Sequence, residues 1–170
     1  MNERKLVSHQ NILVKMIQKR EEKSNITFGS QTKMLSSVGI IGEPHGYGRM
    51  HSLIKVIVED KMKWDMSTNY TKKISYSYMG YNRTEITRTL DYTKLNCNII
   101  LCGLSVMYQW EEALKKTSLR WRSVLNKKIA AITNPNHYDV ILCSPNMYNN
   151  FIKRFKHKFA FKRFIMLNPL

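Results

Sequence analysis

The sequence predicts an α/β domain built on a mainly parallel sheet. Short, fully apolar runs, such as 98–102 and 139–143, alternate with longer segments whose apolar residues recur at helical spacing. Strands that alternate with helices in this way are typical of a parallel sheet, because each crossover helix returns the chain to the same edge. A length of 170 residues suits a single domain over 1–170, and we expect no internal repeat.

The first half of the chain should contain two helices, one strand and a long excursion. Apolar residues of 4–22 recur at helical spacing, and Ser8 is the expected N-cap. Weak alternation at 74–78 favours a hairpin within the excursion. The expected elements are a helix at 4–22, an irregular stretch at 23–36, a strand at 38–41, a glycine-rich loop, a helix ending near 62, and the excursion at 63–94.

The second half of the chain should alternate strand and helix. The runs at 98–102 and 139–143 are apolar throughout, as in buried parallel strands. Ser105 and Ser144 are the expected N-caps of the helices that follow, and Pro145 suits a first helical turn. The expected elements are strands at 98–102, 122–125, 139–143 and 161–166, and helices at 105–117, at 127–132 and from 145 onward.

The charge of the chain favours a polyanionic partner. With 28 Lys and Arg against 12 Asp and Glu, the net charge is +16. Such a charge destabilises the folded chain through self-repulsion, which makes nucleic acid the favoured partner over a merely solvated basic surface. The densest basic run, 151–163, contains no acid, and Phe151 and Phe155 should anchor it as a helix in the core. Its candidate phosphate contacts are Lys153, Arg154, Lys156 and Lys158.

The cysteines and the termini point to an intracellular protein. Cys97, Cys102 and Cys143 lie in apolar runs without C-x-x-C spacing or a nearby histidine, so we expect buried, reduced thiols. The first residues lack the apolar stretch of a signal peptide, and no run approaches the roughly 20 residues of a membrane span. The histidines show no metal-ligand spacing, so no metal site is expected.

Residues 38–57 contain what resembles a damaged phosphate-binding loop. An intact loop has the pattern G-x-x-x-x-G-K-[ST], in which backbone N–H groups and a helix N-terminus hold the phosphates. Here Arg49 occupies the lysine position and Met50 the position of the hydroxyl that binds Mg²⁺. The interval from Gly42 to Gly48, which includes Gly46, is one residue too long. An ordinary tight turn is the alternative interpretation of these glycines.

Five segments, taken in order, resemble motifs in the first RecA-like domain of DEAD/Snf2-like superfamily 2 helicases. Among these, the chain is most similar to the helicases and early-transcription-factor ATPases of large DNA viruses. The segments are LVSHQNILVKMIQKREE, similar to the glutamine motif; GIIGEPHGYGRMHSLI, similar to motif I; NIILCGLSVMYQWEEALKKT, similar to motif Ia; YDVILCSPNMYNNFIKRF, similar to motif Ib; and FKRFIMLNPL, at the place of motif II.

The resemblance implies a truncated three-layer P-loop NTPase (RecA-like) fold. Intact members of the family use ATP and Mg²⁺ to move along DNA; for this chain we expect weak or no ATP binding, and a nucleic-acid partner for which DNA is favoured over RNA. Gln10 would bind adenine, and Gly42, Gly46, Gly48 and Arg49 would bind the phosphates. Ser105, Gln109 and Ser144 would contact nucleic acid. The resemblance further implies a host-cytoplasm or virion location and a complementary chain that supplies the rest of the helicase.

The place of motif II departs from the family. There an Asp-Glu pair holds the Mg²⁺ water shell, whereas this chain has Leu167 and Asn168, which carry no charge. We therefore expect no catalytic residue, no metal ligand, and a catalytically inactive relative that keeps its affinity for nucleic acid. The alternative is a non-enzymatic, basic nucleic-acid-binding or virion structural protein that reuses the fold.

Overall fold

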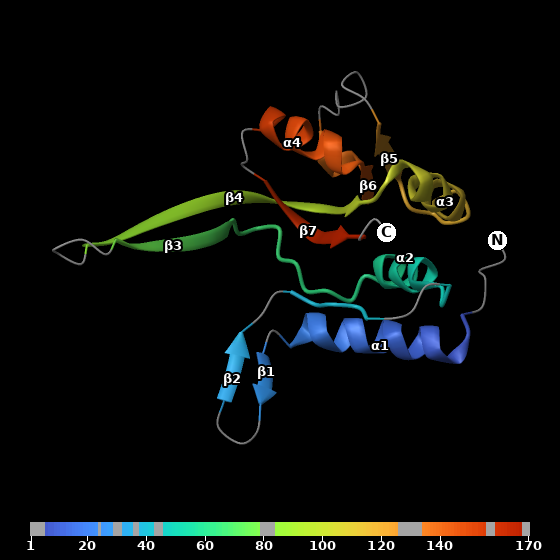
Figure 1. Ribbon diagram of the computed structural model, residues 1–170, viewed down its shortest axis with the longest axis horizontal. Helices are drawn as coiled ribbons and strands as arrows, with labels where there is room; N and C mark the ends of the chain where they lie inside the picture. Colours follow the sequence, from blue (N-terminus) through green and yellow to red (C-terminus); the bar gives the residue numbers. More distant parts are fainter. Residues whose placement is uncertain are drawn as a thin grey trace. The chain divides into compact units, whose positions relative to one another are not determined.

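The computed structural model describes most of the chain as two compact units (Figure 1). One unit comprises Met1–Lys63 and Tyr108–Leu119, and the other comprises Trp64–Met107 and Arg120–Leu170. The described residues are 6–23, 25–28, 32–35, 38–42, 46–78, 84–125, 134–155 and 159–167.

The first unit contains two packed helices and a small hairpin. Helices α1 (Ser8–Glu22) and α2 (Arg49–Glu59) lie against each other, and β1 (Asn25–Phe28) pairs antiparallel with β2 (Thr32–Leu35) (Figure 1). The buried face of α2 is apolar and includes Val56 and Ile57, so burial of this face stabilises the helix. Gln18 of α1 is also buried, and its side-chain amide donates a hydrogen bond to Glu59 at the end of α2.

Four expectations for this unit are wrong. Residues 38–42 form no strand, and Ile40 is 93% exposed. Apolar and β-branched residues favour a strand without ensuring one, because strand propensity depends strongly on context. The stretch 23–36 is not wholly irregular, because it contains the β1–β2 hairpin. Helix α1 has Val7, not Ser8, at its N-cap, and α2 ends at Glu59 rather than near Met62.

The second unit is built on four parallel strands. Their order is β7 (Phe159–Met166), β4 (Thr84–Leu101), β6 (Val140–Cys143) and β5 (Trp121–Val124). Helix α4 (Pro145–Arg154) links β6 to β7, and a short 3-10 helix, η1 (Pro135–His137), precedes β6. Helix α3 (Leu104–Leu114) follows β4 and has residues in both units. The predicted α/β class with a mainly parallel sheet is confirmed, while the predicted helix at 127–132 lies outside the described residues.

Strand β4 pairs with different strands along its length, first antiparallel and then parallel. Its first half pairs antiparallel with β3 (Tyr70–Tyr78), from Thr84 to Tyr92, which confirms the predicted hairpin. Its second half pairs in parallel with β7 from Thr93 onward and with β6 from Asn98 onward. The β3–β4 ribbon therefore extends beyond the parallel part of the sheet (Figure 1).

Helix α4 covers one face of the parallel sheet and forms the core with it (Figure 1). Phe151 is fully buried there, with the rings of Phe155 and Phe161 at centroid distances of 5.2 Å and 6.2 Å. This confirms the predicted role of Phe151 as a core anchor. Cys97 and Cys143 are buried and free in the same core, and burial raises the pKa of each thiol to about 12. Cys102 is likewise buried and is not in a disulfide, so the expectation of buried, reduced thiols is confirmed.

Candidate nucleotide and nucleic-acid sites

The glycine loop ends in backbone conformations that favour glycine. Gly46 has φ +86° and Gly48 has φ +81°, both in the left-handed region. Gly48 is the N-cap of α2, and its carbonyl oxygen accepts hydrogen bonds from the N–H groups of His51 and Ser52. Arg49 is therefore the first residue of the helix, where the earliest N–H groups have no partner within the helix. This geometry suits an anion.

Gln10 connects α1 to this loop. Its Oε1 atom accepts a hydrogen bond from the Val7 N–H at 3.2 Å, and its Nε2 atom donates one to the Tyr47 carbonyl oxygen at 3.1 Å. A Cβ atom on Gly48 would collide with the same Nε2 atom, so the amide lies directly against the loop. The structure thus brings together three predicted site residues, Gln10, Gly48 and Arg49, while Gly42 lies earlier in the irregular segment 38–42.

Two residues at this place were not predicted from the sequence. The His9 Nε2 atom lies 3.1 Å from the Tyr47 carbonyl oxygen, which requires the tautomer with a proton on Nε2. The rings of His9 and Tyr47 meet edge to face, with centroids 5.3 Å apart, and Tyr47 is exposed. The signal for Tyr47 was its position between two glycines of the loop. Nothing in the sequence around His9 indicated its contact with Tyr47, because that contact depends on how α1 packs against the loop.

The residues present do not fit Mg²⁺. Met50, whose thioether is a poor ligand for a hard cation, follows Arg49 in the first turn of α2. In the described parts of the chain, no group of three or more His, Cys, Asp or Glu residues is placed to hold a metal ion. At the place of motif II, Leu167 donates its backbone N–H to the Leu101 carbonyl oxygen at 2.9 Å, and Asn168 lies outside the described residues. The described start of α2 thus places an arginine and a methionine where a Mg²⁺-dependent phosphate loop has a lysine and a hydroxyl.

The two serines that follow strands lie at the carboxyl edge of the sheet. Leu101 pairs with Cys143 where β4 and β6 end, so the chain segments leading to Ser105 and Ser144 leave the same edge. Ser144 is the N-cap of α4, as predicted, but its side chain is 6% exposed. Ser105 is exposed in the first turn of α3 and is not its N-cap, because that turn closes on the Gly103 carbonyl oxygen. Gln109, one turn further along, is exposed as well.

The basic run 151–163 does not form a single surface. Lys153 and Arg154 are exposed in the last turn of α4, while Lys156 and Lys158 lie outside the described residues. Lys162 and Arg163 of β7 are each 9% exposed. Their Nζ and Nη1 atoms donate hydrogen bonds to the Oδ1 atoms of Asn96 and Asn98, at 3.2 Å and 3.1 Å.

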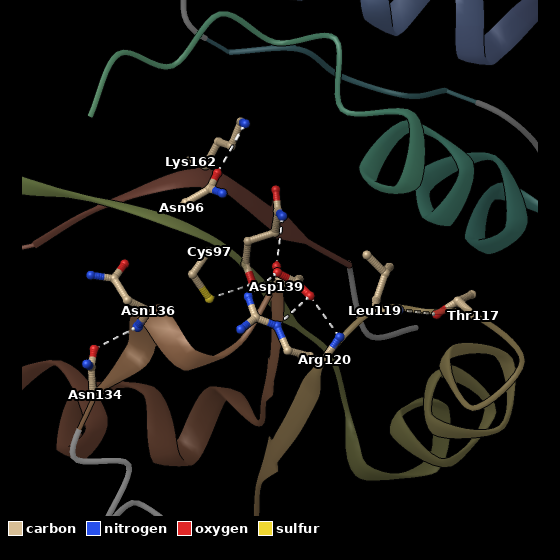
Figure 2. A network of polar contacts seen from close by, with 10 residues as sticks. Asn96, Cys97, Thr117, Leu119, Arg120, Asn134, Asn136, Asp139 and Lys162 are labelled. Carbon is tan, nitrogen blue, oxygen red and sulfur yellow. Dashed lines mark hydrogen bonds and ion pairs between the residues drawn. The ribbon is translucent and has the colours of Figure 1, made fainter. Parts of the chain in front are cut away.

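A polar network at the amino edge of the sheet has a structural role (Figure 2). Asp139 accepts hydrogen bonds from the backbone N–H and the guanidinium of Arg120, and these bonds hold the pKa of its carboxyl below the usual range. The Asn98 amide donates to the Asp139 carbonyl oxygen at 2.9 Å. These contacts join the starts of β5 and β6 to β4, at the opposite edge of the sheet from Ser105 and Ser144.

Comparison with known proteins supports the fold. No protein-family model matches the chain, and no curated protein matches it. The chain is similar to the SWI2/SNF2 ATPase core of Sulfolobus solfataricus, solved in complex with double-stranded DNA, with a TM-score of 0.54 and 17% sequence identity. The match covers 98% of this chain and 32% of that one, so the chain spans about a third of the length of its structural neighbour. The likeness shows that this chain shares the α/β fold of part of that structure.

Proposed function

We propose that this chain is a DNA-binding domain with the fold of a superfamily 2 ATPase lobe and that it does not hydrolyse ATP by itself. The observation that carries the proposal is the start of α2, where Arg49 and Met50 follow the left-handed Gly48. The loop-and-helix geometry that receives a phosphate is kept, while the lysine and the hydroxyl that serve Mg·ATP are replaced. A viral origin, which the resemblance to helicases of large DNA viruses implies, belongs to the same proposal.

The nucleotide part of the site should bind weakly. Arg49 offers a planar, permanently charged group in place of a compact ammonium, so it attracts phosphate without reproducing the position of lysine. The Gln10 amide keeps a second N–H and a second lone pair beyond its bonds to Tyr47 and Val7, and these are the groups available to an adenine edge. We expect calorimetry with Mg·ATP to give no micromolar affinity.

The nucleic-acid part of the proposal rests on charge. The chain carries +16, and Lys153 and Arg154 are exposed together at the end of α4. That the structural neighbour was solved with double-stranded DNA supports DNA as the partner proposed here. Lys156 and Lys158 follow directly in sequence and would extend the same phosphate contacts.

Charge reversal at α4 tests this proposal. The double variant Lys153→Glu/Arg154→Glu should weaken binding to a DNA duplex and lower the slope of log K against log salt by about 0.9 for each lost phosphate contact. The control is Lys115→Glu/Lys116→Glu, an equal reversal at two exposed, consecutive lysines after α3. Equal effects of the two double variants would show that binding follows net charge alone, and the α4 assignment would be wrong.

A virion or nucleoprotein role is the second candidate. It is favoured by the charge of +16 together with Arg49 and Met50 at the positions of the lysine and of the Mg²⁺-binding hydroxyl. A packaging protein should coat long duplex DNA without sequence preference and without any effect of ATP. A nucleotide-dependent change in DNA affinity would exclude this second candidate.

A further inference from the structure

The two faces of the β3–β4 ribbon differ sharply in composition. Residues paired directly across an antiparallel ribbon share a face, and the register pairs Tyr70 with Tyr92 and Thr71 with Asp91. The even-numbered positions, from 70 to 78 and from 84 to 92, hold four tyrosines, three aliphatic residues, one threonine, Lys72 and Arg88. We call these positions the tyrosine face. The odd-numbered positions, the polar face, hold only Ser, Thr, Lys73, Glu85 and Asp91.

The described end of the tyrosine face is open to solvent. Tyr70 is 42% exposed and Leu90 is 39% exposed. The rings of Tyr70 and Tyr92 form a tilted pair with centroids 6.3 Å apart. A two-stranded ribbon is marginally stable in water by itself, and an uncovered apolar face adds to that cost. The tyrosine face therefore has the composition of a binding surface.

Both formal charges at positions of the tyrosine face are positive. The two acids of the ribbon occupy the polar face, where Asp91 accepts a hydrogen bond from Thr71 Oγ1 at 2.7 Å. Lysine is depleted in the cores of protein–protein interfaces, whereas cations interleaved with aromatic rings suit a strand whose bases stack and whose phosphates need counter-charges. The charge pattern thus favours a nucleic acid over a protein as the occupant.

The start of the parallel part of β4 holds the ribbon at its base. The Trp64 indole N–H donates to the Leu95 carbonyl oxygen at 3.1 Å, and the Lys94 ammonium lies 5.2 Å from the centre of the Trp64 ring. Lys94 also donates to the Asp65 carbonyl oxygen and to Thr68 Oγ1. These contacts anchor the ribbon to the sheet, so its tyrosine face is presented from a fixed support.

We propose that the tyrosine face of the β3–β4 ribbon binds single-stranded nucleic acid, with tyrosines stacking on bases and Lys72 contacting the phosphate backbone. Different elements form this surface and carry the cations of α4. The inference rests on the proposed nucleic-acid function and adds to it a preference for unpaired bases at the ribbon.

The test compares two neighbouring lysines on opposite faces. Lys72→Gln and Lys73→Gln remove the same charge from adjacent, exposed positions. Fluorescence anisotropy with a labelled 20-nucleotide oligo(dT) should show weaker binding for Lys72→Gln and a salt slope reduced by about 0.7, whereas Lys73→Gln should resemble wild type. Equal behaviour of the two variants would overturn the inference.

A tyrosine series provides the second comparison. The double variant Tyr70→Leu/Tyr92→Leu should weaken oligo(dT) binding roughly tenfold, while Tyr70→Phe/Tyr92→Phe should stay within about twofold of wild type, because phenylalanine still stacks. Circular dichroism spectra of both variants would be compared with that of wild type to check that the variants are folded. If the leucine variant binds as wild type, or changes only the oligomeric state, the inference is wrong.

A 20-base-pair duplex separates this inference from the proposed function. Salt-sensitive duplex binding that depends on α4, together with ribbon variants that behave as wild type on oligo(dT), would overturn the ribbon assignment alone. A wild-type protein that binds neither DNA would overturn both.

Discussion

Gly48 lies so close to the side chain of Gln10 that a Cβ atom on Gly48 would collide with Gln10 Nε2. The same Nε2 atom donates its hydrogen bond to the Tyr47 carbonyl oxygen. Packing of α1 against the glycine loop therefore depends on a residue without a side chain at the N-cap of α2. This contact links the first helix of the chain to the place where a phosphate would bind.

Gly48→Ala should destabilise the protein more than Gly46→Ala. Both substitutions place an L-residue at positive φ, which costs about 1–2 kcal/mol. Only Gly48→Ala also displaces Gln10, and the lost hydrogen bond to Tyr47 adds about 1 kcal/mol. Urea denaturation measures the difference. Equal destabilisation by both variants would show that Gln10 does not hold the loop.

Phe151→Ala should cost about 3–5 kcal/mol, because a fully buried ring is removed from the core beneath α4. Phe164→Ala is the matched control, since Phe164 is 50% exposed and its ring forms an edge-to-face pair with Tyr148 at a centroid distance of 5.6 Å. Chemical denaturation of both variants measures the costs. A small effect of Phe151→Ala, together with a loss of DNA binding in a folded protein, would instead identify this ring as a base-stacking residue.

Asp139→Asn should lower the thermal midpoint near pH 7 by roughly 2–4 °C. The folded-state pKa of Asp139 is depressed, first by its hydrogen bond from Arg120, below the unfolded value of about 3.9. The stabilisation is therefore complete above the unfolded pKa and is lost as the pH falls through the folded pKa. The gap between wild type and variant should therefore narrow and then close as the pH falls below the unfolded value of about 3.9.

Glu112→Gln is the control for this pH dependence. Glu112 pairs with Lys115 on an exposed surface, where an ion pair contributes little to stability. Its thermal midpoint should stay close to that of wild type at every pH. A gap between wild type and Asp139→Asn that stays constant from pH 7 to pH 2 would contradict the role assigned to the Arg120 contact.

The parallel strands could be predicted because each is a compact apolar run. Ile99, Ile141 and their neighbours are buried on both faces, and this environment selects continuous apolar sequence. The start of β4 at Thr84 was harder to predict from the sequence. A two-stranded ribbon tolerates Thr, Arg and Tyr, and these residues occur equally in loops. The apolar run at 38–41 shows the converse, because its composition favours a strand and yet it forms none.

The candidate site could be predicted only in part. The start of α2 at Arg49 follows from local glycine chemistry, which sequence reveals. The meeting of His9, Gln10 and Tyr47 joins residues 37 and 38 positions apart, and no local pattern encodes such packing. The burial of Lys162 and Arg163 could not be predicted either, because their hydrogen-bond acceptors, Asn96 and Asn98, lie on another strand far away in the sequence.

The most direct test of the account is ATP turnover measured beside DNA binding in one preparation of the protein. Phosphate release from Mg·ATP would be followed with and without saturating DNA, and DNA affinity would be followed by anisotropy at several salt concentrations. The account predicts salt-sensitive DNA binding and phosphate release no faster than the buffer blank, with or without DNA. DNA-stimulated phosphate release that is abolished by Arg49→Ala would contradict it.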